Sequence, residues 1–251
     1  SGFSDFAGST LVHACGGAAA LAGVIVLGPR EGRFGTKGEK KSMVPFAASS
    51  IPLVVLGTFL LWFGWFGFNG FSQLAMGTFD DVNAITTIAV NTHLAGAAGT
   101  VVGAALTRLI GGKTDIVMML NGALAGLVAI TAEPLTPDPL LAMLIGGIGA
   151  VIMYFGTKFL ESQKIDDVVG AIPVHMFAGI FGTLVVPMSN PDTNFGSQLL
   201  GVISVCVFSF VLSYIVFKAL KETIGLRISK EAEKLGTDKA EVGVVAYSIR
   251  D

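Results

Sequence analysis

Two histidines of the chain stand at equivalent positions of a repeated motif. The pattern D-x-x-G-x-x-x-V-H-x-x-x-G occurs twice, and its fixed residues are Asp5, Gly8, Val12, His13 and Gly17 in one copy and Asp167, Gly170, Val174, His175 and Gly179 in the other. A neutral imidazole both donates and accepts hydrogen bonds, and it changes charge near neutral pH. A pair of such rings would suit the binding of a small polar solute or a proton relay.

Histidines inside apolar segments also have simpler explanations. A single one is most often a hydrogen-bonded core residue, and we interpret His93 in this way because it has no counterpart in the repeat. A metal site usually needs three or four ligands, and two histidines without clustered cysteines or carboxylates fall short. We therefore predict no metal and no cofactor. Cys15 and Cys206 both lie inside apolar runs, where a thiol behaves as a small hydrophobe.

The composition indicates which elements must hold these histidines. Of the 251 residues, 52% are hydrophobic and only 14% are charged, against roughly 25% charged in soluble domains. The formal net charge is −2 and the basic residues form no long run, so nucleic acid is not an expected partner. We predict an all-α polytopic membrane protein.

Seven apolar runs have about the length needed to cross a bilayer, which takes roughly 20 helical residues. They cover about residues 5–28, 44–70, 83–111, 115–132, 139–159, 168–188 and 196–220. The connectors between them are short and polar. Residues 1–224 are therefore predicted to be the membrane domain, and residues 225–251 a charged tail.

The basic residues give these spans a consistent orientation. The first, third and fifth connectors and the tail hold all 16 cations, among them Arg30, Arg33, Lys37, Lys40, Lys41, Arg108, Lys113, Lys158 and Lys164. The other three connectors hold Asp80, Asp81, Glu133, Asp138 and Asp192 instead. Because Lys and Arg are retained in the cytoplasm, we expect the first span to run inward and the tail to be cytoplasmic, in a cell membrane.

With this topology the two copies of the motif run in opposite directions, which is typical of inverted-repeat transport folds with a site near the midplane. Each histidine follows its aspartate by eight residues, or about 12 Å of helix. This distance runs from the outer side of the membrane for His13 and from the inner side for His175, so we expect both imidazoles at nearly the same depth. Glycines one turn further on, Gly17 and Gly179, would let the helices approach closely.

The second span ends in a dense aromatic run, which comprises Trp62, Phe63, Trp65, Phe66, Phe68 and Phe71, near Ser72. For Trp62 and Phe66 we favour an ordinary role as anchors at the membrane interface. Trp65 and Phe68 are three residues apart and can share one helix face. Aromatic faces beside a hydroxyl would attract a small cation.

These segments resemble the ammonium transporter (Amt/Rh) family, in the right order and over essentially the whole chain. The similar strings are DFAGSTLVH at 5–13, GWFGFN at 64–69, NGALAGL at 121–127 and the segment around His175. The resemblance implies a homotrimer with a narrow, mostly hydrophobic pore through each subunit. Trp65 and Ser72 would then recruit ammonium at an outer site, with Phe68 as the gate beneath it. His13 and His175 would line the pore.

The same resemblance implies roles for the two aspartates and for the tail. Asp5 and Asp167 would support the site structurally or electrostatically. The tail, from Gly225 to Tyr247, is similar to one that packs beneath the trimer and meets PII-type signalling proteins. Family members have about eleven spans, so this chain would correspond to the last seven, with the N-terminal four missing.

Two functions remain open after this comparison. The first is ammonium transport, in which NH4+ is deprotonated and NH3 passes the histidine pair. The alternative is an ammonium sensor that signals through its tail with little flux. A membrane enzyme is not expected, because the spans hold no pairing of nucleophile and base.

Overall fold

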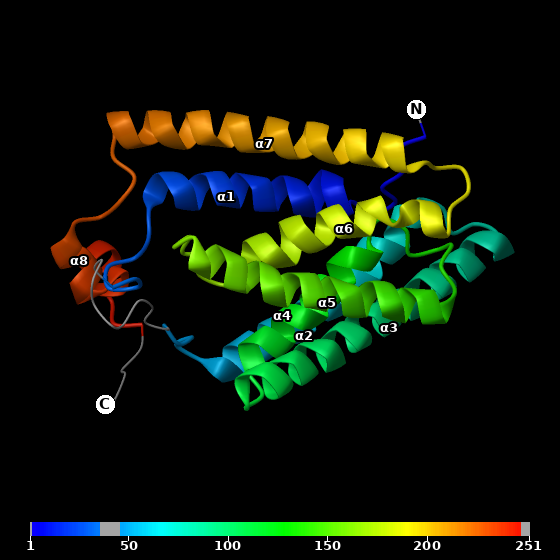
Figure 1. Ribbon diagram of the computed structural model, residues 1–251, viewed down its shortest axis with the longest axis horizontal. Coiled ribbons are helices and arrows are strands. Elements are labelled where there is room, and N and C mark those ends of the chain that lie inside the picture. The colour runs from blue at the N-terminus through cyan, green and yellow to red at the C-terminus, as the bar shows by residue number, and fades with distance from the viewer. Residues whose placement is uncertain (1, 36–45, 247–251) are drawn as a thin grey trace.

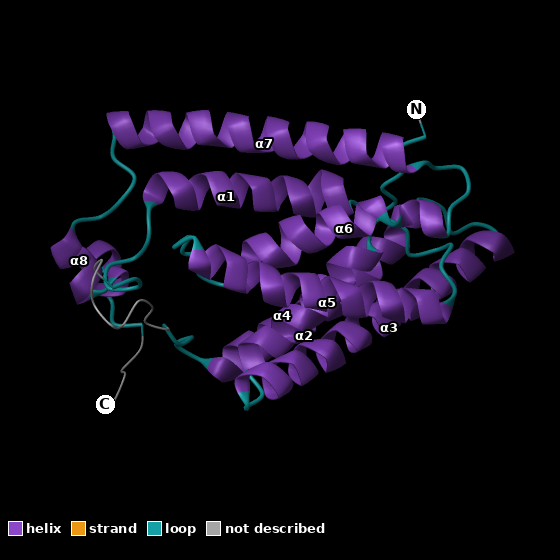
Figure 2. Cartoon of the chain, in the orientation of Figure 1, coloured by secondary structure: helices purple, strands orange, loops and turns teal. Residues whose placement is uncertain are grey.

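The computed structural model describes residues 2–35 and 46–246, so Lys37, Lys40, Lys41, Tyr247 and the first residues of the second predicted span lie outside the described part. The described chain folds into helices joined by short connectors (Figures 1 and 2). They are η1 (Ser9–Ala14), α1 (Cys15–Leu27), α2 (Ile51–Gly70), η2 (Phe71–Gln73), α3 (Phe79–Gly111), α4 (Ile116–Ile130), α5 (Pro139–Ser162), η3 (Ile172–Phe177), α6 (Ala178–Leu184), η4 (Val186–Met188), α7 (Phe195–Thr223), α8 (Lys230–Leu235) and η5 (Asp238–Val242).

Local sequence signals explain where several long helices begin. Thr78 and Asp81 form a reciprocal capping box at the start of α3. Asp115 accepts a hydrogen bond from the Met118 N–H at the start of α4. Asp138 caps α5, whose first residue is Pro139, a position where the missing N–H costs nothing.

Five of the predicted spans are confirmed as helices long and apolar enough to cross a membrane, at Ser9–Leu27, Ile51–Gln73, Phe79–Gly111, Pro139–Ser162 and Phe195–Thr223. The other two are shorter than expected. The fourth has only the 15 residues of α4, or about 22 Å. The sixth divides into η3, α6 and η4 between Ile172 and Met188.

The helices form two groups, and the η3–α6 segment, which carries the second copy of the motif, lies between them (Figure 1). Helices α1 and α7 pack side by side, and α3, α4 and α5 pack against one another. The η3–α6 segment contacts α1 on one side and α4 and α5 on the other. It runs opposite to η1–α1 (Figure 1), so the antiparallel relation expected of the repeat is confirmed within the molecule.

The two motif aspartates act as matching caps, which corrects the expectation that Asp5 opens a span as part of its helix. Asp5 lies before η1, and its Oδ2 accepts hydrogen bonds from the Thr10 and Leu11 N–H groups at 3.0 and 2.8 Å. Asp167 accepts three such bonds, including one from the Ile172 N–H at 2.7 Å. Thr10 and Ile172 occupy the same position of the motif, so the two copies also share this hydrogen bond to the aspartate carboxylate.

Glycines let the two motif helices cross at backbone contact. A Cβ atom added to Gly17 would lie 2.5 Å from the Met176 Cβ, and one added to Gly179 would overlap the Ser9 carbonyl oxygen. Met176 and Ala14 each follow their histidine, and Ala14 N also lies against Gly179. The crossing therefore brings the residues around His13 and His175 together from both sides.

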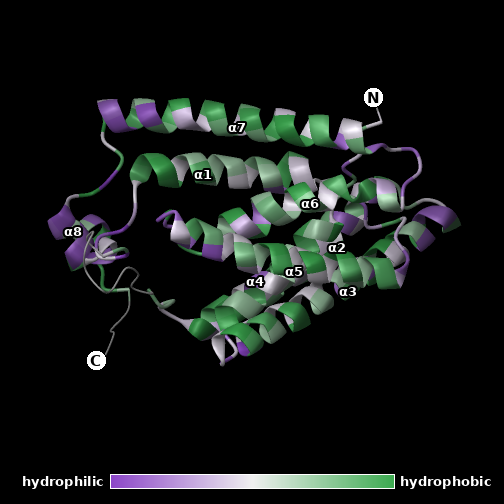
Figure 3. Cartoon of the chain, viewed as in Figure 1, coloured by the Kyte–Doolittle hydropathy of each residue, from purple (hydrophilic) through white to green (hydrophobic). Residues whose placement is uncertain are grey.

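The tail packs at the C-terminal end of α1. Arg227 donates to the carbonyl oxygens of Leu27, Gly28 and Pro29 and forms an ion pair with Glu233 of α8 at 2.8 Å. These carbonyls lie at and just beyond the C-terminus of α1, where a cation is favourable. Figure 3 shows the hydrophilic α8 beside the mostly apolar helices. The division of the chain near residue 224 remains a prediction.

We predict that Gly179→Ala destabilises the folded protein by about 1–3 kcal/mol, because the new methyl group overpacks the crossing. Gly57→Ala is the matched control, since no atom of the described residues outside its own helix backbone lies within 4 Å of the added Cβ and alanine favours helix. The fraction of monodisperse protein after heating in detergent measures both. Equal heat resistance of the two variants would contradict the close crossing.

Candidate functional site

The two motif histidines meet at the centre of the crossing. The Nδ1 atoms of His13 and His175 lie 3.2 Å apart, and the ring centroids are 5.2 Å apart with an interplanar angle of 20°. The expectation of equal depth is thus confirmed. A hydrogen bond at this distance requires one protonated and one bare Nδ1. Two neutral rings that share it must therefore be opposite tautomers.

Both histidines sit in π-helical turns. The His13 N–H bonds to the Gly8 carbonyl at 3.1 Å, five residues back, and Gly8 has a positive φ of 108°. Gly170 takes the same left-handed conformation before η3, with a φ of 77°. Wide turns of this kind are often found at functional sites. Sequence periodicity does not reveal them, although the paired glycines mark where they begin.

Two aromatic residues of α2 pack on His13. Trp65 stacks on the imidazole with centroids 5.0 Å apart and planes at 13°, and the Phe68 ring lies 5.4 Å away, tilted by 40°. The Trp65 side chain is 5% exposed, and its indole N–H donates to Thr131 Oγ1 at 2.9 Å. The sequence grouped Trp65 with Ser72 in an outer site, whereas the structure groups it with the histidines.

Ser72 lies one turn beyond Phe68, in η2. Its hydroxyl donates to the Phe68 carbonyl oxygen at 2.8 Å, and its oxygen can still accept a hydrogen bond. The order along the chain is therefore Trp65 beside the histidines, then Phe68, then Ser72 toward the end of α2. Ser72 follows Trp65 by seven positions, which corresponds to about 10 Å of helix.

A groove of about 210 Å³ runs beside the histidine pair and is mostly apolar. Its lining residues are Val12, His13, Gly16, Gly17, Ala20, Ala171 and His175. Val12 and Gly16 are exposed, so the groove is open on the η1–α1 side. His13 Nε2 is buried and has no hydrogen-bond partner among the described residues. The groove is large enough for a small solute to reach two imidazoles.

Two further aromatic residues of α2, Trp62 and Phe66, form a second cluster with the third histidine. The His93 ring lies 5.5 Å from Trp62 and 6.3 Å from Phe66, between α2 and α3. The structure therefore separates His93 from the paired histidines. Its packing against Trp62 and Phe66 was not predicted from the sequence.

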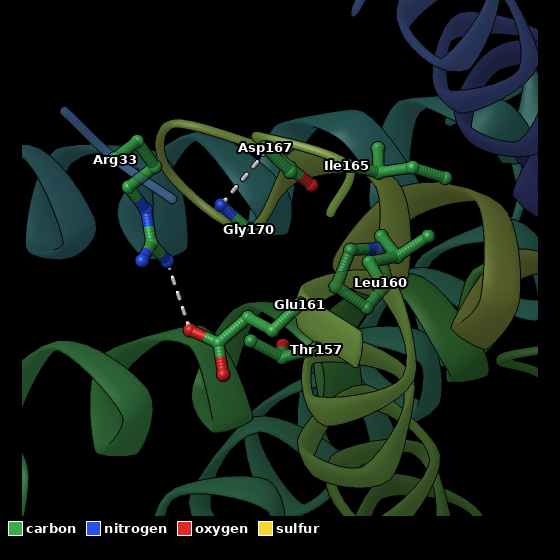
Figure 4. A pocket seen from close by; sticks show the side chains of 8 residues that line it. Arg33, Thr157, Leu160, Glu161, Ile165, Asp167 and Gly170 are labelled. Atoms are coloured by element: carbon green, nitrogen blue, oxygen red, sulfur yellow. Dashed lines mark hydrogen bonds and ion pairs between the residues drawn. The ribbon is translucent and has the colours of Figure 1, made fainter. Parts of the chain in front are cut away.

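The segment that leads into the N-terminus of η3 is anchored by an ion-pair cluster that no sequence pattern predicted. Arg30 makes a two-pronged ion pair with Asp166, at 2.7 and 2.8 Å. Arg33 reaches Glu161 at 3.0 Å, across a small cavity of about 30 Å³ next to Asp167 and its bond to the Gly170 N–H (Figure 4). Arg30 and Asp166 are 136 residues apart. Their location in polar connectors is the one sequence feature consistent with this contact.

Comparison with known proteins identifies the family. The model of the Ammonium Transporter Family matches residues 1–247. The chain belongs to the ammonium transporter family. It is 41% identical to ammonium transporter Amt2 of Archaeoglobus fulgidus over 98% of the chain, and 39% identical to the putative ammonium transporter sll1017 of Synechocystis over 96%. These relatives are named as transporters, not enzymes, and the chain is a membrane protein of the same family.

Solved structures agree with this assignment. A protein named Sensor Amt Protein superposes with a TM-score of 0.88 at 37% identity, covering 96% of this chain and 60% of that one. Mep2 of Candida albicans gives a TM-score of 0.81 at 29% identity, covering 96% and 56%. This chain spans 55% of the length of each of the two transporters named above. The ammonium transporter fold predicted from sequence is confirmed for the part present.

The ion pair of Arg30 with Asp166 makes a pH-dependent contribution to stability. Burial raises the pKa of Asp166, but the hydrogen bonds from Arg30 and the Arg30 charge outweigh burial and leave this pKa below its usual value. A carboxyl whose pKa is lower in the folded state stabilises the protein above its unfolded pKa, about 3.9, and loses this effect as the pH falls through the folded value.

We therefore predict that Asp166→Asn lowers stability by about 2 kcal/mol at pH 7. The difference from the unsubstituted protein should shrink as the pH falls below about 4. Apparent thermal midpoints in detergent at several pH values measure this. Glu222→Gln is the control, because the Glu222 pair with Lys218 is exposed on both sides and should contribute little. A pH-independent effect of Asp166→Asn would contradict the ion-pair explanation.

Proposed function

We propose that this chain forms the histidine-bearing part of an ammonium-conducting pore. The observation that carries the proposal is the 3.2 Å contact between the Nδ1 atoms of His13 and His175, beside an apolar groove. Membership of the ammonium transporter family supplies the substrate class. The curated relatives are longer, so conduction is proposed for the protein with its complete natural chain.

The positive charge of ammonium is the main barrier to its passage through an apolar pore. An ammonium ion held in apolar surroundings pays a large desolvation cost, whereas neutral ammonia needs little more than a polar partner. We infer that NH4+ loses a proton before it reaches the groove. NH3 then donates to or accepts from the imidazoles, and the opposed tautomers offer both kinds of site. The released proton can pass separately along the paired rings.

Recruitment is proposed to occur toward the outer end of α2. The Ser72 hydroxyl donates to the Phe68 carbonyl, so its oxygen can accept from an ammonium N–H. The Phe68 ring, 39% exposed and in contact with His13, is suited to act as the gate between Ser72 and the pair. The Trp65 N–H donates to Thr131 and so is not free to bind the solute. We infer that Trp65 instead orients His13, on which its ring stacks. Asp5 and Asp167 hold the two π-helical turns.

The orientation and partners of the protein are part of the same proposal. The acidic connectors would face outward and the cationic connectors and the tail would face the cytoplasm, in a cell membrane. A homotrimer is expected by analogy with the family. The tail, docked on α1 through Arg227, is then a candidate surface for a PII-type protein.

A sensor is the second candidate function. The solved structure with a TM-score of 0.88 is that of a protein named as a sensor. In this chain the tail also connects, through Arg227, to the end of the helix that carries His13. Occupancy of the histidine site could then be reported to a cytoplasmic partner with little flux.

Electrical recording of the whole protein in liposomes tests the proposal. We expect a saturating current evoked by ammonium and not by sodium. His175→Ala should change its size or its selectivity, and His93→Ala, outside the paired site, should leave both unchanged. Current that is identical in the His175→Ala variant would contradict the paired-histidine pore. Ammonium binding without current would favour the sensor.

A further inference from the structure

The C-terminal end of α4 lies inside the molecule, and its backbone carbonyls are bonded to the segment that leads into η1. The Phe6 and Ala7 N–H groups donate to the Ala132 and Thr131 oxygens at 2.7 and 3.0 Å. The Ser9 hydroxyl donates to the Val128 oxygen at 2.6 Å. Carbonyls at a helix end need partners from outside the helix. The shortness of α4 thus allows its end to hold the start of the His13 helix.

One side chain at this helix end reaches the aromatic residues of the site. Thr131 is fully buried, and its hydroxyl donates to the Leu127 oxygen at 2.7 Å. Because the hydroxyl has only one proton, the oxygen is left as an acceptor, and the Trp65 indole N–H donates to it at 2.9 Å. The other tryptophan, Trp62, has a buried indole N–H without a partner among the described residues.

We propose that Thr131 is a positioning residue for the histidine pair and acts through Trp65. The Trp65 ring is fixed at its N–H by Thr131 and stacks on His13 at 5.0 Å. His13 in turn holds its Nδ1 3.2 Å from that of His175. The orientation of the shared hydrogen bond therefore depends on a hydroxyl that touches neither histidine. A role in ammonium passage rests on the proposed function, but the geometric part does not.

A purely structural role of Thr131 makes a different prediction. Many buried threonines donate to the carbonyl four residues back, and Thr58 of α2 does so to the Val54 oxygen at 2.9 Å. If Thr131 served only its own helix, removing its hydroxyl would change stability and leave the imidazoles as they are. A positioning role requires the histidine tautomers to change.

The experiment compares Thr131→Val, Thr131→Ser and the control Thr58→Val in the full natural chain with 15N-labelled histidine. We expect Thr131→Val to abolish the Trp65 N–H hydrogen-bond signal in the resonance Raman difference spectrum and to shift the histidine tautomer populations in the NMR spectrum. Ammonium-specific transport per folded protein should fall about tenfold, as for the loss of one buried hydrogen bond. Thr131→Ser should restore all three, and Thr58→Val should change none.

Unchanged tautomers in a folded Thr131→Val protein would overturn the proposal, and so would a failure of Thr131→Ser to restore them. Absence of ammonium-specific transport in the unsubstituted protein would contradict the proposed function. In that case the tautomer comparison still decides whether Thr131 positions the pair.

Discussion

The hydrogen bond between two imidazoles, at the crossing of the two motif helices, is the interaction on which the rest of this structure depends. Polar rings in apolar surroundings are unfavourable unless each finds a partner. The Nδ1 atoms of His13 and His175 are partners at 3.2 Å, and the arrangement of their helices permits this contact. The helices run in opposite directions, cross at glycines and begin at matched motif positions. The repeat of Asp, Gly and His accounts for all three features.

The same constraint explains why two segments do not form full spans. Helix α4 ends at Ile130 within the protein, where its carbonyls accept hydrogen bonds from residues 6–9. The η3 segment begins only at Ile172, held by the Asp167 carboxylate. Irregular backbone at membrane depth is tolerated where protein surrounds it. Both breaks therefore lie where they position a histidine-bearing turn and its partners.

Sequence reasoning predicted the parts of the structure that follow from regular patterns. Hydropathy identified the long helices, and the repeat predicted both the antiparallel crossing and the meeting of His13 with His175. The sequence did not predict the position of Trp65 on His13, because spacing along α2 does not show which element faces it. Thr131, Arg30 and Asp166 were missed for a similar reason. Their partners lie 66 residues or more away in the chain, and no local pattern marks them.

The decisive measurement follows the three histidines of this chain by 15N NMR while ammonium is added to the complete protein in lipid. We expect His13 and His175 to be opposite neutral tautomers coupled across Nδ1. Ammonium should shift their signals while those of His93 stay in place. Two histidines in the same tautomer, uncoupled and insensitive to ammonium, would contradict a shared hydrogen bond at the centre of the site.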